Sequence, residues 1–437
     1  MLRNLKLLHI SDIHIGVESY GKVATEEDLV SFPVYFAPGE DRSQFIGMNT
    51  RLLDFLSAMD EAVAYAIENR IDLVLFAGDA YKSRDPSQTH QREFAKRINR
   101  LSDADIPVFL TVGNHDLPHI ANRATSLEIF PTLNVKNITV SQTLETHIIG
   151  TPSGDIQVVG LPWIRIGQFM AKEETRNMNM EEIKQALENR LTSLLETEVA
   201  SLDKTLPSVL CAHVNISGSK TASERSMMLG NDHLLSLGSV AIKEFDYVAL
   251  GNIHKYQILT HNPPVVYAGS IERVDFSEEK EDKGFVSVQL DPTMPNGERL
   301  LSHDFIPVHA RSMITINVSP KLGEDPTEAS LNEIEKNSEK LANAIVRFKI
   351  NLTSEQEPHF NESEIRQKLN VCFYFAGIEK NISREHRTRI AVSDAEKITP
   401  SNAIRKYFET KSLPKSREEE LMKYVQVLLQ EEFEDSH

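Results

Sequence analysis

The chain of 437 residues has few cysteines and no long apolar segment. Its two cysteines, Cys211 and Cys372, lie far apart and form no metal-binding or redox motif, a usage that is typical of a reducing cytoplasm. No apolar run approaches the roughly 20 residues that a membrane-spanning helix needs. The N-terminus becomes polar too early for a signal peptide, so we expect it to form the first strand of the fold.

An excess of basic residues is also missing. The formal net charge is −17, from 47 Lys and Arg residues against 64 Asp and Glu residues. Because proteins gain much of their affinity for DNA by neutralising phosphates with Lys and Arg, the chain as a whole would repel a nucleic acid. Any binding of DNA therefore needs a local basic surface, bound metal ions or a partner that supplies the positive charge.

The length predicts two or three domains, since a single core rarely exceeds about 250–300 residues. Over residues 1–300, apolar strands alternate with amphipathic helices, which predicts an α/β domain. A strand–helix–strand–helix–strand pattern over 308–395 predicts a small α+β domain. The spacing of apolar residues over 396–437 predicts two short amphipathic helices, which either pack back on the rest of the protein or bind a partner protein.

Two predicted helices of the first domain have a clear apolar face. Asn49 or Thr50 is positioned to cap one of them, and Ser87 to cap the other. The residues predicted to face inward are Leu52, Phe55, Leu56, Met59, Val63 and Ile67 in the first helix, and Phe94, Ile98 and Leu101 in the second. Residues 15–47, rich in Gly, Pro, Ser and acidic residues, are interpreted either as a lid beside a site or as an insertion.

Five short polar clusters each follow an apolar strand and supply Asp, His or Asn, side chains that bind divalent metals. They are Ser11-Asp12-Ile13-His14, Gly78-Asp79, Gly113-Asn114-His115-Asp116, Ala212-His213 and Gly251-Asn252-Ile253-His254. Each cluster alone is typical of a turn, but five of them in this order indicate one site. If the strands lie in packed sheets, the clusters converge at their carboxyl ends, where open α/β folds build their sites.

The clusters fit a site for two divalent metals, which can clamp the attacking and leaving oxygens of a phosphoryl displacement. Such a site needs a carboxylate that bridges both ions, and Asp79 suits this role because Gly78 before it leaves room. Asp12 and His14 lie two residues apart on an extended segment, so we expect both to bind one ion. His254 completes the ligands of that first ion.

The remaining polar side chains of the clusters have other candidate roles. Asn114 offers a neutral carbonyl oxygen and His213 an imidazole. His115 is not needed as a ligand, so it is a candidate to donate a proton to the leaving oxygen or to clamp the phosphate as a cation. Asp116 is a candidate to orient that imidazole.

The motifs DIH, GD, GNHD, a strand-final His and GxxH, in this order, resemble the calcineurin-like metallophosphoesterase superfamily. Longer stretches resemble, within it, the SbcD family of double-strand-break repair nuclease subunits. They are GDAYKSRDPS, IPVFLTVGNHD, SERSMMLG, FDYVALGNIHKYQ and YAGSIERVDFSEEKEDKGFVSVQL. The likeness also extends over the small α+β domain and the terminal helices, and so over nearly the whole chain.

The resemblance implies a four-layer αββα metallophosphoesterase core, a DNA-capping domain over 308–395 and a C-terminal segment that binds the coiled coil of an SbcC-like ABC-type ATPase. It implies two manganese ions, with magnesium as the alternative. The ligands implied for the first ion are Asp12, His14, Asp79 and His254, and those for the second ion are Asp79, Asn114 and His213. His115 is implied as the catalytic histidine, and a homodimer as forming through the helix from Ser87 and the segment 121–130.

Two positions depart from the family's pattern. The family's last motif is Gly-His-x-His, whose first His binds the second metal, whereas this chain has Asn252 there, either as a natural variant or as an engineered change. Because an amide offers only a weak carbonyl oxygen in place of an imidazole, we expect weaker binding of the second ion and lower activity. Archaeal and eukaryotic members also carry a His three residues after the GD aspartate, where this chain has Lys82.

Three hypotheses about function follow. The leading one is a manganese-dependent DNA nuclease subunit, with double-strand exonuclease and single-strand endonuclease activity in double-strand-break repair. The second is a phosphodiesterase that acts on nucleotides or other small phosphoesters, which the capping-like domain and the partner-binding tail disfavour. The third is a scaffold of the same complex, catalytically impaired by Asn252.

Overall fold

The computed structural model describes residues 3–31, 41–118, 123–165, 178–221, 234–383 and 421–425. The chain divides into two compact units, one of residues 1–350 and 359–381 and the other of 351–358 and 382–437. The terminal helices predicted over 396–437 lie outside the described residues, apart from a helical stretch at 421–425. No helix within the described ranges is long and apolar enough to cross a membrane.

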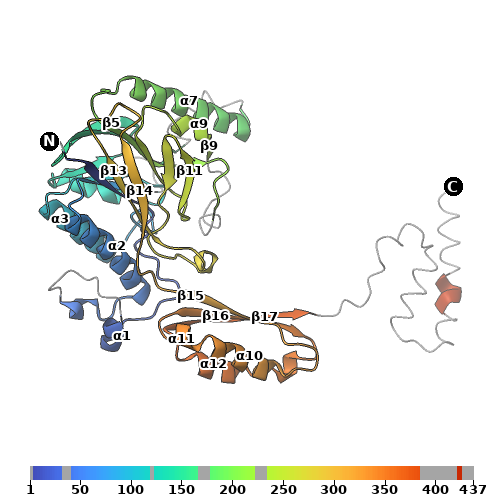
Figure 1. Cartoon of the computed structure of the whole chain (residues 1–437). Coiled ribbons are helices and arrows are strands. Elements are labelled where there is room, and N and C mark those ends of the chain that lie inside the picture. Colours follow the sequence, from blue (N-terminus) through green and yellow to red (C-terminus); the bar gives the residue numbers. More distant parts are fainter. Residues whose placement is uncertain are drawn as a thin grey trace, which may run out of the picture. The chain divides into compact units, whose positions relative to one another are not determined.

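Two six-stranded sheets form the centre of the first unit (Figure 1). The first has the order β14 (Leu300–Pro307), β13 (Gly284–Leu290), β1 (Leu5–Ile10), β2 (Leu73–Phe76), β3 (Val108–Thr111), β4 (Ile138–Ser141). The second has the order β11 (Gln257–His261), β12 (Pro264–Tyr267), β10 (Tyr247–Gly251), β7 (Ser208–His213), β6 (Gly154–Leu161), β5 (Glu145–Thr151). The pairs β1–β2, β2–β3 and β3–β4 are parallel, as are β6–β7, β7–β10 and β10–β12, so each parallel set has its carboxyl ends at one edge.

The two sheets pack face to face, and helices cover their outer faces. One buried apolar cluster lies between the sheets and combines Leu75 and Phe109 of the first with Val158 and Cys211 of the second. Helices α2 (Thr50–Glu68) and α3 (Gln88–Asp103) pack on the outer face of the first sheet, and α7 (Met180–Ala200) and α9 (Leu237–Val240) on that of the second. The four layers confirm the predicted αββα core.

The predicted caps and apolar faces of α2 and α3 are confirmed with one exception. The side chain of Asn49 accepts a hydrogen bond from the N–H of Arg51, and that of Ser87 from the N–H of His90. The residues predicted to face inward are buried, except that Ile67 is 39% exposed. The prediction for Ile67 was wrong because it lies in the last turn of α2, where its neighbour Ala66 takes the buried position.

Short elements fill the connections of the core. They are α1 (Glu26–Ser31), η1 (Arg42–Phe45), η2 (Ser126–Glu128), α4 (Ile129–Thr132), β8 (Asn215–Ile216), β9 (Leu234–Leu235) and η3 (Phe276–Glu278). The segment 15–47 contains α1 and η1, and its residues 32–40 lie outside the described residues. Both interpretations of that segment, as a lid and as an insertion, stay predictions.

A three-stranded sheet follows the core in the sequence. Its strands are β15 (Met313–Val318), β16 (Ile345–Thr353) and β17 (Tyr374–Ser383), and the helices between them are α10 (Pro326–Lys336), α11 (Ser338–Leu341), η4 (Glu357–His359) and α12 (Glu362–Leu369). The predicted order of strands and helices is confirmed, and the first helix of the pattern, α10, begins at Pro326. The helix begins there because Asp325 caps it and Pro326 stands in its first turn, a position that suits proline.

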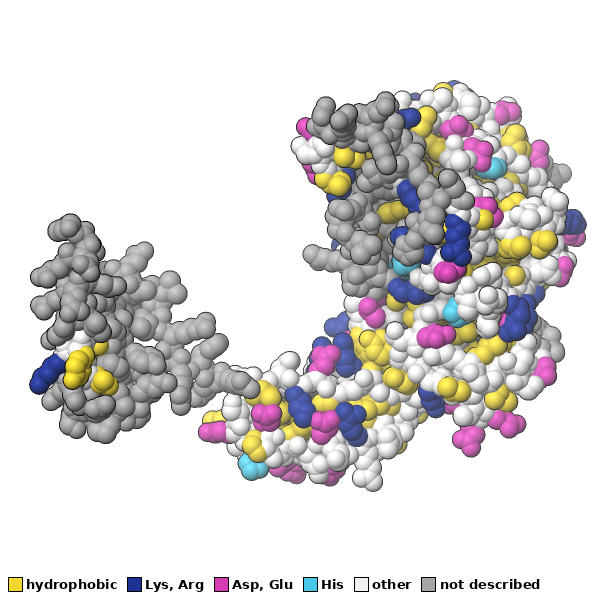
Figure 2. All heavy atoms as spheres, turned by 180° about the vertical axis from the view of Figure 1, so that it is seen from behind, with side chains coloured by type: hydrophobic (Ala, Val, Ile, Leu, Met, Phe, Trp, Pro, Cys, Tyr) yellow, Lys and Arg dark blue, Asp and Glu magenta, His cyan; other side chains and the backbone are white. Residues whose placement is uncertain are grey.

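Figure 2 shows acidic and basic side chains interspersed over the face that it draws. This distribution agrees with a chain whose formal net charge is −17. Among the described residues drawn in this view, the basic side chains form no broad face that could hold DNA by charge alone.

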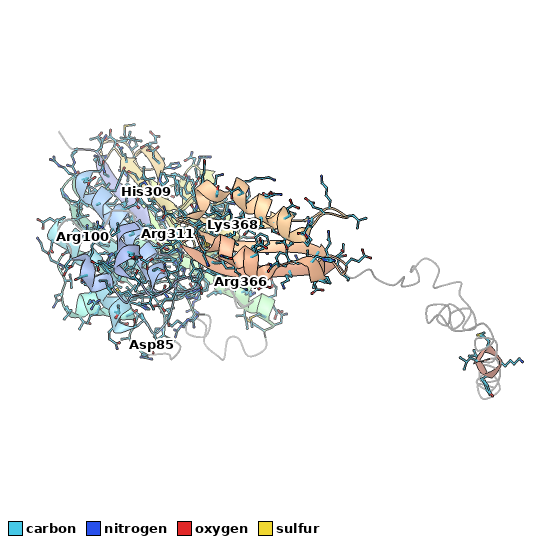
Figure 3. All side chains as sticks on the ribbon, turned by 90° about the horizontal axis from the view of Figure 1, so that it is seen from below. Asp85, Arg100, His309, Arg311, Arg366 and Lys368 are labelled. Carbon is cyan, nitrogen blue, oxygen red and sulfur yellow. The ribbon has the colours of Figure 1, made fainter. Side chains whose placement is uncertain are left out.

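A buried network of ion pairs joins α2 to the segment that leads into β15. Arg51 and Arg311 both bind the carboxylate of Asp54, with Nη1–Oδ2 and Nε–Oδ1 distances of 2.5 and 2.7 Å. The N–H of Arg311 also donates to Glu272 Oε2 at 2.9 Å. Figure 3 labels Arg311 and the nearby His309 where the small sheet adjoins the core. Since all four members of the network are buried, they depend on one another for charge compensation.

We expect Asp54→Ala to destabilise the protein strongly. The substitution leaves two buried guanidinium groups without their shared carboxylate, and breaking a buried ion pair typically costs about 3–5 kcal/mol. Urea denaturation followed by circular dichroism measures the change in the free energy of unfolding. The control is Glu68→Ala at an exposed position of the same helix, and equal unfolding midpoints for the two variants would contradict the expectation.

His9 joins the two sheets from the middle of the core. Its Nδ1 lies 3.0 Å from the hydroxyl of Tyr247, and its Nε2 lies 3.1 Å from the carbonyl oxygen of Leu250, both on β10 of the second sheet. Burial lowers the pKa of His9 to about 3, against the opposing effect of the hydrogen bond with Leu250. The imidazole is therefore neutral in the folded protein at pH 5, whereas in the unfolded chain it is protonated.

This difference predicts that the free energy of unfolding decreases as the pH is lowered from about 6.5 to about 3. Below the pKa of about 6.5 that His9 has in the unfolded chain, the unfolded chain binds one more proton than the folded protein. The titration of His9 alone therefore lowers the free energy of unfolding by about 2 kcal/mol between pH 7 and pH 5. His9→Gln, which cannot titrate, should lose correspondingly less stability over this interval. Urea denaturation at the two pH values measures it, with His261→Gln at an exposed position as control; an identical pH dependence in all three proteins would refute the prediction.

Candidate metal centre

The predicted site residues lie together because they follow strands whose carboxyl ends meet. The strands come from both sheets, so the loops of the two sheets face one another at this edge. Asp12 and His14 follow β1, Asp79 follows β2, Asn114, His115 and Asp116 follow β3, His213 ends β7, and Asn252 and His254 follow β10. Most of these side chains are buried, and Asn114 and His115 are partly exposed.

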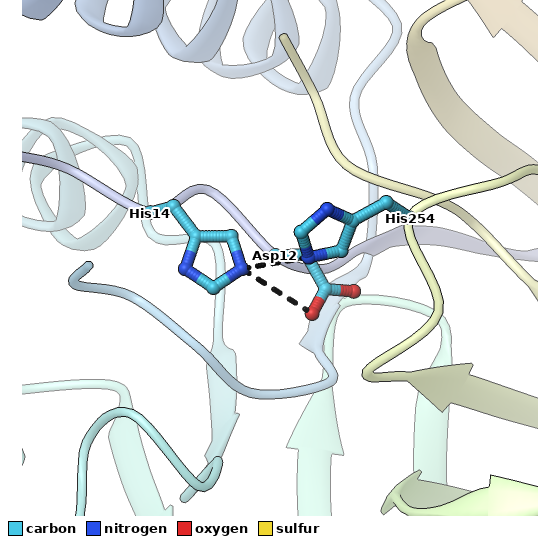
Figure 4. A group of neighbouring side chains, drawn as sticks. All are labelled: Asp12, His14 and His254. Atoms are coloured by element: carbon cyan, nitrogen blue, oxygen red, sulfur yellow. Dashed lines mark hydrogen bonds and ion pairs between the residues drawn. The ribbon is translucent and has the colours of Figure 1, made fainter. Parts of the chain in front are cut away.

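Asp12, His14 and His254 form the first group of candidate ligands (Figure 4). The Nε2 atoms of His14 and His254 face each other at 2.9 Å. Asp12 Oδ1 lies 4.0 Å from His14 Nε2. Three side chains from two different sheets thus present nitrogen and oxygen atoms to the same point.

Asp79 lies between this group and a second one. Its Oδ2 is 3.7 Å from His14 Nε2 and 3.4 Å from His213 Nε2. On the far side, Asn114 Oδ1 is 3.1 Å from the same His213 Nε2. Three overlapping sets of residues have ligand atoms within 4.8 Å of one another: Asp12, His14 and His254; His14, Asp79 and His115; and Asp12, Asp79 and His213.

The hydrogen bonds behind the imidazoles determine which atoms face the centre. His254 Nδ1 lies 2.9 Å from Glu278 Oε1, and His213 Nδ1 lies 2.7 Å from the carbonyl oxygen of Ala77. Both partners are acceptors, so each Nδ1 carries a proton and Nε2 is the nitrogen that faces the centre. These Nε2 atoms face a third imidazole nitrogen and carboxylate or amide oxygens. Such a set of converging nitrogen and oxygen atoms fits divalent metal ions, which bind in place of the protons on Nε2.

The electrostatics of the centre also favour cations. Burial would lower the pKa of His213, but the charges of Asp79 and Asp12 and the hydrogen bonds with Asp79 and Ala77 together raise the pKa to about 9. Burial likewise would raise the pKa of Asp79, yet the imidazoles of His213 and His115 hold that pKa well below its usual range. The carboxylate of Asp79 therefore keeps its negative charge at the middle of the centre.

The backbone at the centre is held in unusual conformations. Asp12, His14, Asp79 and Asn252 have φ angles of 51°, 49°, 58° and 95°, in a region that non-glycine residues rarely occupy. Such conformations cost about 1–3 kcal/mol each and cluster at functional sites. Gly78 has a φ of 91°, and a Cβ there would lie 2.3 Å from His213 Nδ1, so the position requires glycine, as predicted.

The structure corrects the predicted role of Asp116. Its carboxylate accepts hydrogen bonds from the backbone N–H groups of Asp79, Ala80 and Gly113, at 3.0, 3.0 and 2.9 Å. It therefore ties the loop after β2 to the loop after β3 instead of orienting His115. The imidazole of His115 is held by another group, since its Nδ1 lies 2.8 Å from the carbonyl oxygen of Lys82. Adjacent residues in a tight turn point in different directions, so adjacency to His115 was misleading.

Asn252 makes two separate contributions. Its backbone N–H donates to both carboxylate oxygens of Asp12, at 3.1 and 3.0 Å. Its side-chain Nδ2 donates to Asn215 Oδ1, a contact that was not predicted from the sequence. The amide group of Asn252 is thus paired with a second amide, where the resemblance led us to expect an imidazole.

A family model described as calcineurin-like phosphoesterase matches residues 5–256, more than half of the chain and the range that contains all of the candidate ligands. The chain belongs to this family. Calcineurin-like phosphoesterases use metal ions, which agrees with the converging nitrogen and oxygen atoms of the site. The identity of the metal does not follow from the match.

Relatives with curated names are similar to the chain at low identity. The DNA double-strand break repair protein Mre11 of Methanosarcina mazei is 24% identical over 372 residues, which cover 83% of this chain and 48% of that protein. The D subunit of the nuclease SbcCD of Bacillus subtilis is 24% identical over 299 residues, 66% of this chain and 67% of that protein. The uncharacterized metallophosphoesterase YhaO of Bacillus subtilis is 24% identical over 310 residues, 71% of this chain and 62% of that protein. The chain thus spans about half to two thirds of the length of these relatives.

Glu278 and Lys283 belong to the centre, although no role was predicted for them from the sequence. Glu278 Oε1 contacts His254, and its Oε2 pairs with Lys283 Nζ at 2.7 Å. Lys283 Nζ also donates to the carbonyl oxygen of His254 at 3.0 Å. Lys283 therefore holds His254 both directly, through its backbone, and indirectly, through Glu278. Burial would raise the pKa of Glu278, but Lys283 and His254 together outweigh burial and hold the pKa well below its usual range, so the carboxylate stays charged. Both residues lie in the stretch SIERVDFSEEKEDKGF, whose density of charged residues was the available signal.

We predict that Glu278→Gln weakens metal binding at His254. The substitution removes the negative charge that fixes the proton on Nδ1 of His254, and loss of such an outer partner typically lowers metal affinity about 10–100-fold. Isothermal titration calorimetry with Mn²⁺ measures the change. Asp282→Asn, at an exposed position of the same stretch, is the matched control, and equal affinities in both variants would contradict the prediction.

Proposed function

We propose that this chain is a metal-dependent phosphodiesterase that hydrolyses DNA as the nuclease subunit of a double-strand-break repair complex. The observation that carries the proposal is the convergence of the Nε2 atoms of His14, His213 and His254 with carboxylate and amide oxygens. A centre of this kind suits two divalent metals, which is the arrangement used to displace an oxygen at phosphorus.

In this proposal, the two ions share Asp79. Asp12, His14 and His254 would hold the first ion together with Asp79, whose Oδ2 lies 3.7 Å from His14 Nε2. Asn114 and His213 would hold the second ion, with Asn252 as a weak or absent ligand. The metals, which we propose to be manganese, would supply Lewis acidity to a phosphate and to a water molecule.

His115 is proposed as the catalytic histidine. Because the carbonyl oxygen of Lys82 holds its Nδ1 at 2.8 Å, the other nitrogen, Nε2, is available to the reaction. The ring packs edge to face on His14 with centroids 5.0 Å apart, so it borders the first group of candidate ligands. From there Nε2 would give a proton to the leaving oxygen or stabilise the charge on the phosphate.

DNA is proposed as the substrate because two of the relatives are named for DNA double-strand break repair and for a nuclease complex. The net charge of −17 opposes tight DNA binding by this chain alone. We therefore propose that an SbcC-like ABC-type ATPase provides much of the affinity for DNA. We also propose a homodimer, formed through α3 and the segment 121–130.

A specific observation favours a second candidate, an impaired nuclease that serves as a scaffold. The amide of Asn252 is hydrogen-bonded to Asn215. This bond uses Nδ2, and the neutral Oδ1 that the amide offers to a metal ion is a weaker ligand than the imidazole of the family's motif. This candidate differs from the first in the number of ions bound at working concentrations of metal.

The test is a metal titration of DNA cleavage by the wild-type chain and by Asn252→His, with and without the ATPase. We expect Asn252→His to bind the second Mn²⁺ on the order of tenfold more tightly, since an imidazole replaces a neutral amide. Cleavage of blunt duplex and of single-stranded DNA should then saturate at lower metal concentration. Counting bound Mn²⁺ by electron paramagnetic resonance separates binding from activity.

Asn252→Ala and His115→Ala are the controls for this titration. The first removes the side chain without offering an imidazole, and the second removes the proposed proton donor while sparing the proposed ligands. If Asn252→His binds two ions yet cleaves no DNA, with or without the ATPase, DNA hydrolysis is not the function. Preference for a small chromogenic phosphodiester over DNA would instead support a small-molecule phosphodiesterase.

A further inference from the structure

A cavity of about 350 Å³ opens beside the candidate metal centre. Its lining includes Trp163, Arg165, Arg123, Gln142, Leu117 and Pro118. The cavity adjoins the centre through Trp163, whose ring lies edge to face on His213 with centroids 6.1 Å apart. Ligand pockets range from about 300 to 1,000 Å³, so the volume suits one small ligand or one unit of a polymer.

The charge of the cavity favours an anion. Two of the lining side chains, Arg123 and Arg165, are cationic, and Glu128 is the acidic one. Glu128 is already engaged, because its Oε1 accepts a hydrogen bond from the N–H of Thr125 at 3.0 Å. Buried Nη2 of Arg165 has no hydrogen-bond partner in the described part of the chain. A guanidinium with an unused buried donor is suited to bind a phosphate or a carboxylate.

Arg84 adds to this positive charge. Burial and the nearby Arg84 cation both lower the pKa of Arg165, because the charge of Arg84 is close enough to disfavour a second cation. Arg123 pairs with Asp85 at 3.2 Å, and both partners of that pair are more than half exposed. A surface ion pair of this kind contributes little to stability, so it costs little free energy for Arg123 to leave Asp85 and bind a ligand.

Trp163 gives the cavity an apolar, flat side. Its backbone N–H donates to the carbonyl oxygen of Val112 at 2.9 Å, which fixes the chain at this point, and the side chain is partly exposed. An aromatic ring beside guanidinium groups is the combination that binds single-stranded nucleic acid, since the ring stacks on a base while the cations bind its phosphate. A simple anion would not need the indole, and an apolar ligand would not need the arginines.

We propose that this cavity binds one nucleotide of the substrate strand, with the base against Trp163 and a phosphate against Arg165 and Arg123. The proposal rests on the proposed function, since it assigns a subsite to the same substrate. It extends that function because the subsite lies outside the candidate ligands and would seat the strand next to His213. Stacking does not distinguish among bases, so such a subsite would bind DNA without sequence preference.

The chain contains one tryptophan, so its intrinsic fluorescence reports on this cavity alone. The experiment titrates the full chain in EDTA with dAMP, with deoxyadenosine and with inorganic phosphate. We expect dAMP to change the emission of Trp163 in a saturable manner, and the other two to bind at least about fivefold more weakly, since each makes only part of the contacts. Because no metal is present, the result is independent of whether the chain cleaves DNA.

Variants test the individual contacts. Arg165→Ala should weaken the response to dAMP about tenfold, the loss typical of a hydrogen bond to a charged group. Arg366→Ala is the matched control, because Arg366 is an exposed arginine of α12 that pairs with Glu362 (Figure 3). Binding of a labelled single-stranded oligonucleotide, again in EDTA, should fall at least about fivefold in Trp163→Ala and be largely retained in Trp163→Phe, which preserves a stacking ring.

Thermal unfolding of each variant shows whether it is folded. The proposal is overturned if folded wild-type chain shows no saturable response to dAMP, if phosphate alone binds as well as dAMP, or if Arg165→Ala and Arg366→Ala bind equally. A response to dAMP together with absent DNA cleavage would keep the subsite and reject the proposed nuclease. Cleavage together with unaltered oligonucleotide binding in Trp163→Ala would keep the nuclease and reject the subsite.

Discussion

The convergence of imidazole nitrogens and carboxylate oxygens on one buried point is the constraint on which the site depends. The Nε2 atoms of His14 and His254 lie 2.9 Å apart, and Asp79 Oδ2 lies 3.4 Å from His213 Nε2. Because acceptors behind His254 and His213 hold the Nδ1 protons, Nε2 is the atom that each of these rings presents to the centre. A metal ion binds such atoms in place of the protons that otherwise lie between them. The arrangement of these side chains therefore suits a bound metal ion.

Buried polar groups stay this close together only if the surrounding structure is rigid. The core between the two sheets provides this rigidity, and His9 crosses it to reach β10 of the opposite sheet. Asp116 ties the loops after β2 and β3 through backbone hydrogen bonds, and it does so beside Asp79, the central carboxylate. The stability of the sheets thus holds the strained backbone at Asp12, His14 and Asp79 in place.

Much of the site followed from the sequence because strand ends in α/β sheets converge by topology, whatever the details of packing. The buried faces of α2 and α3 could be predicted from the spacing of apolar residues, because the period of a helix is a local property of the backbone. Glu278 was not assigned because it contacts His254 from 24 residues away, at a spacing that no motif encodes. The role given to Asp116 was wrong because side-chain direction within a turn depends on φ and ψ angles that adjacency does not reveal. The pairing of Asn252 with Asn215 likewise depends on how the two sheets pack.

The two contributions of Asn252 explain how the fold accommodates the departure from the family's motif. Its backbone N–H binds Asp12 whatever the side chain is, so the ligands proposed for the first ion keep their support. Its φ angle of 95° suits asparagine, which tolerates positive φ better than most residues. Only the side chain differs from the family's motif, and its amide donates a hydrogen bond to Asn215. The amide at this position therefore costs the fold little, and in the proposed two-metal centre its effect would be confined to the second ion.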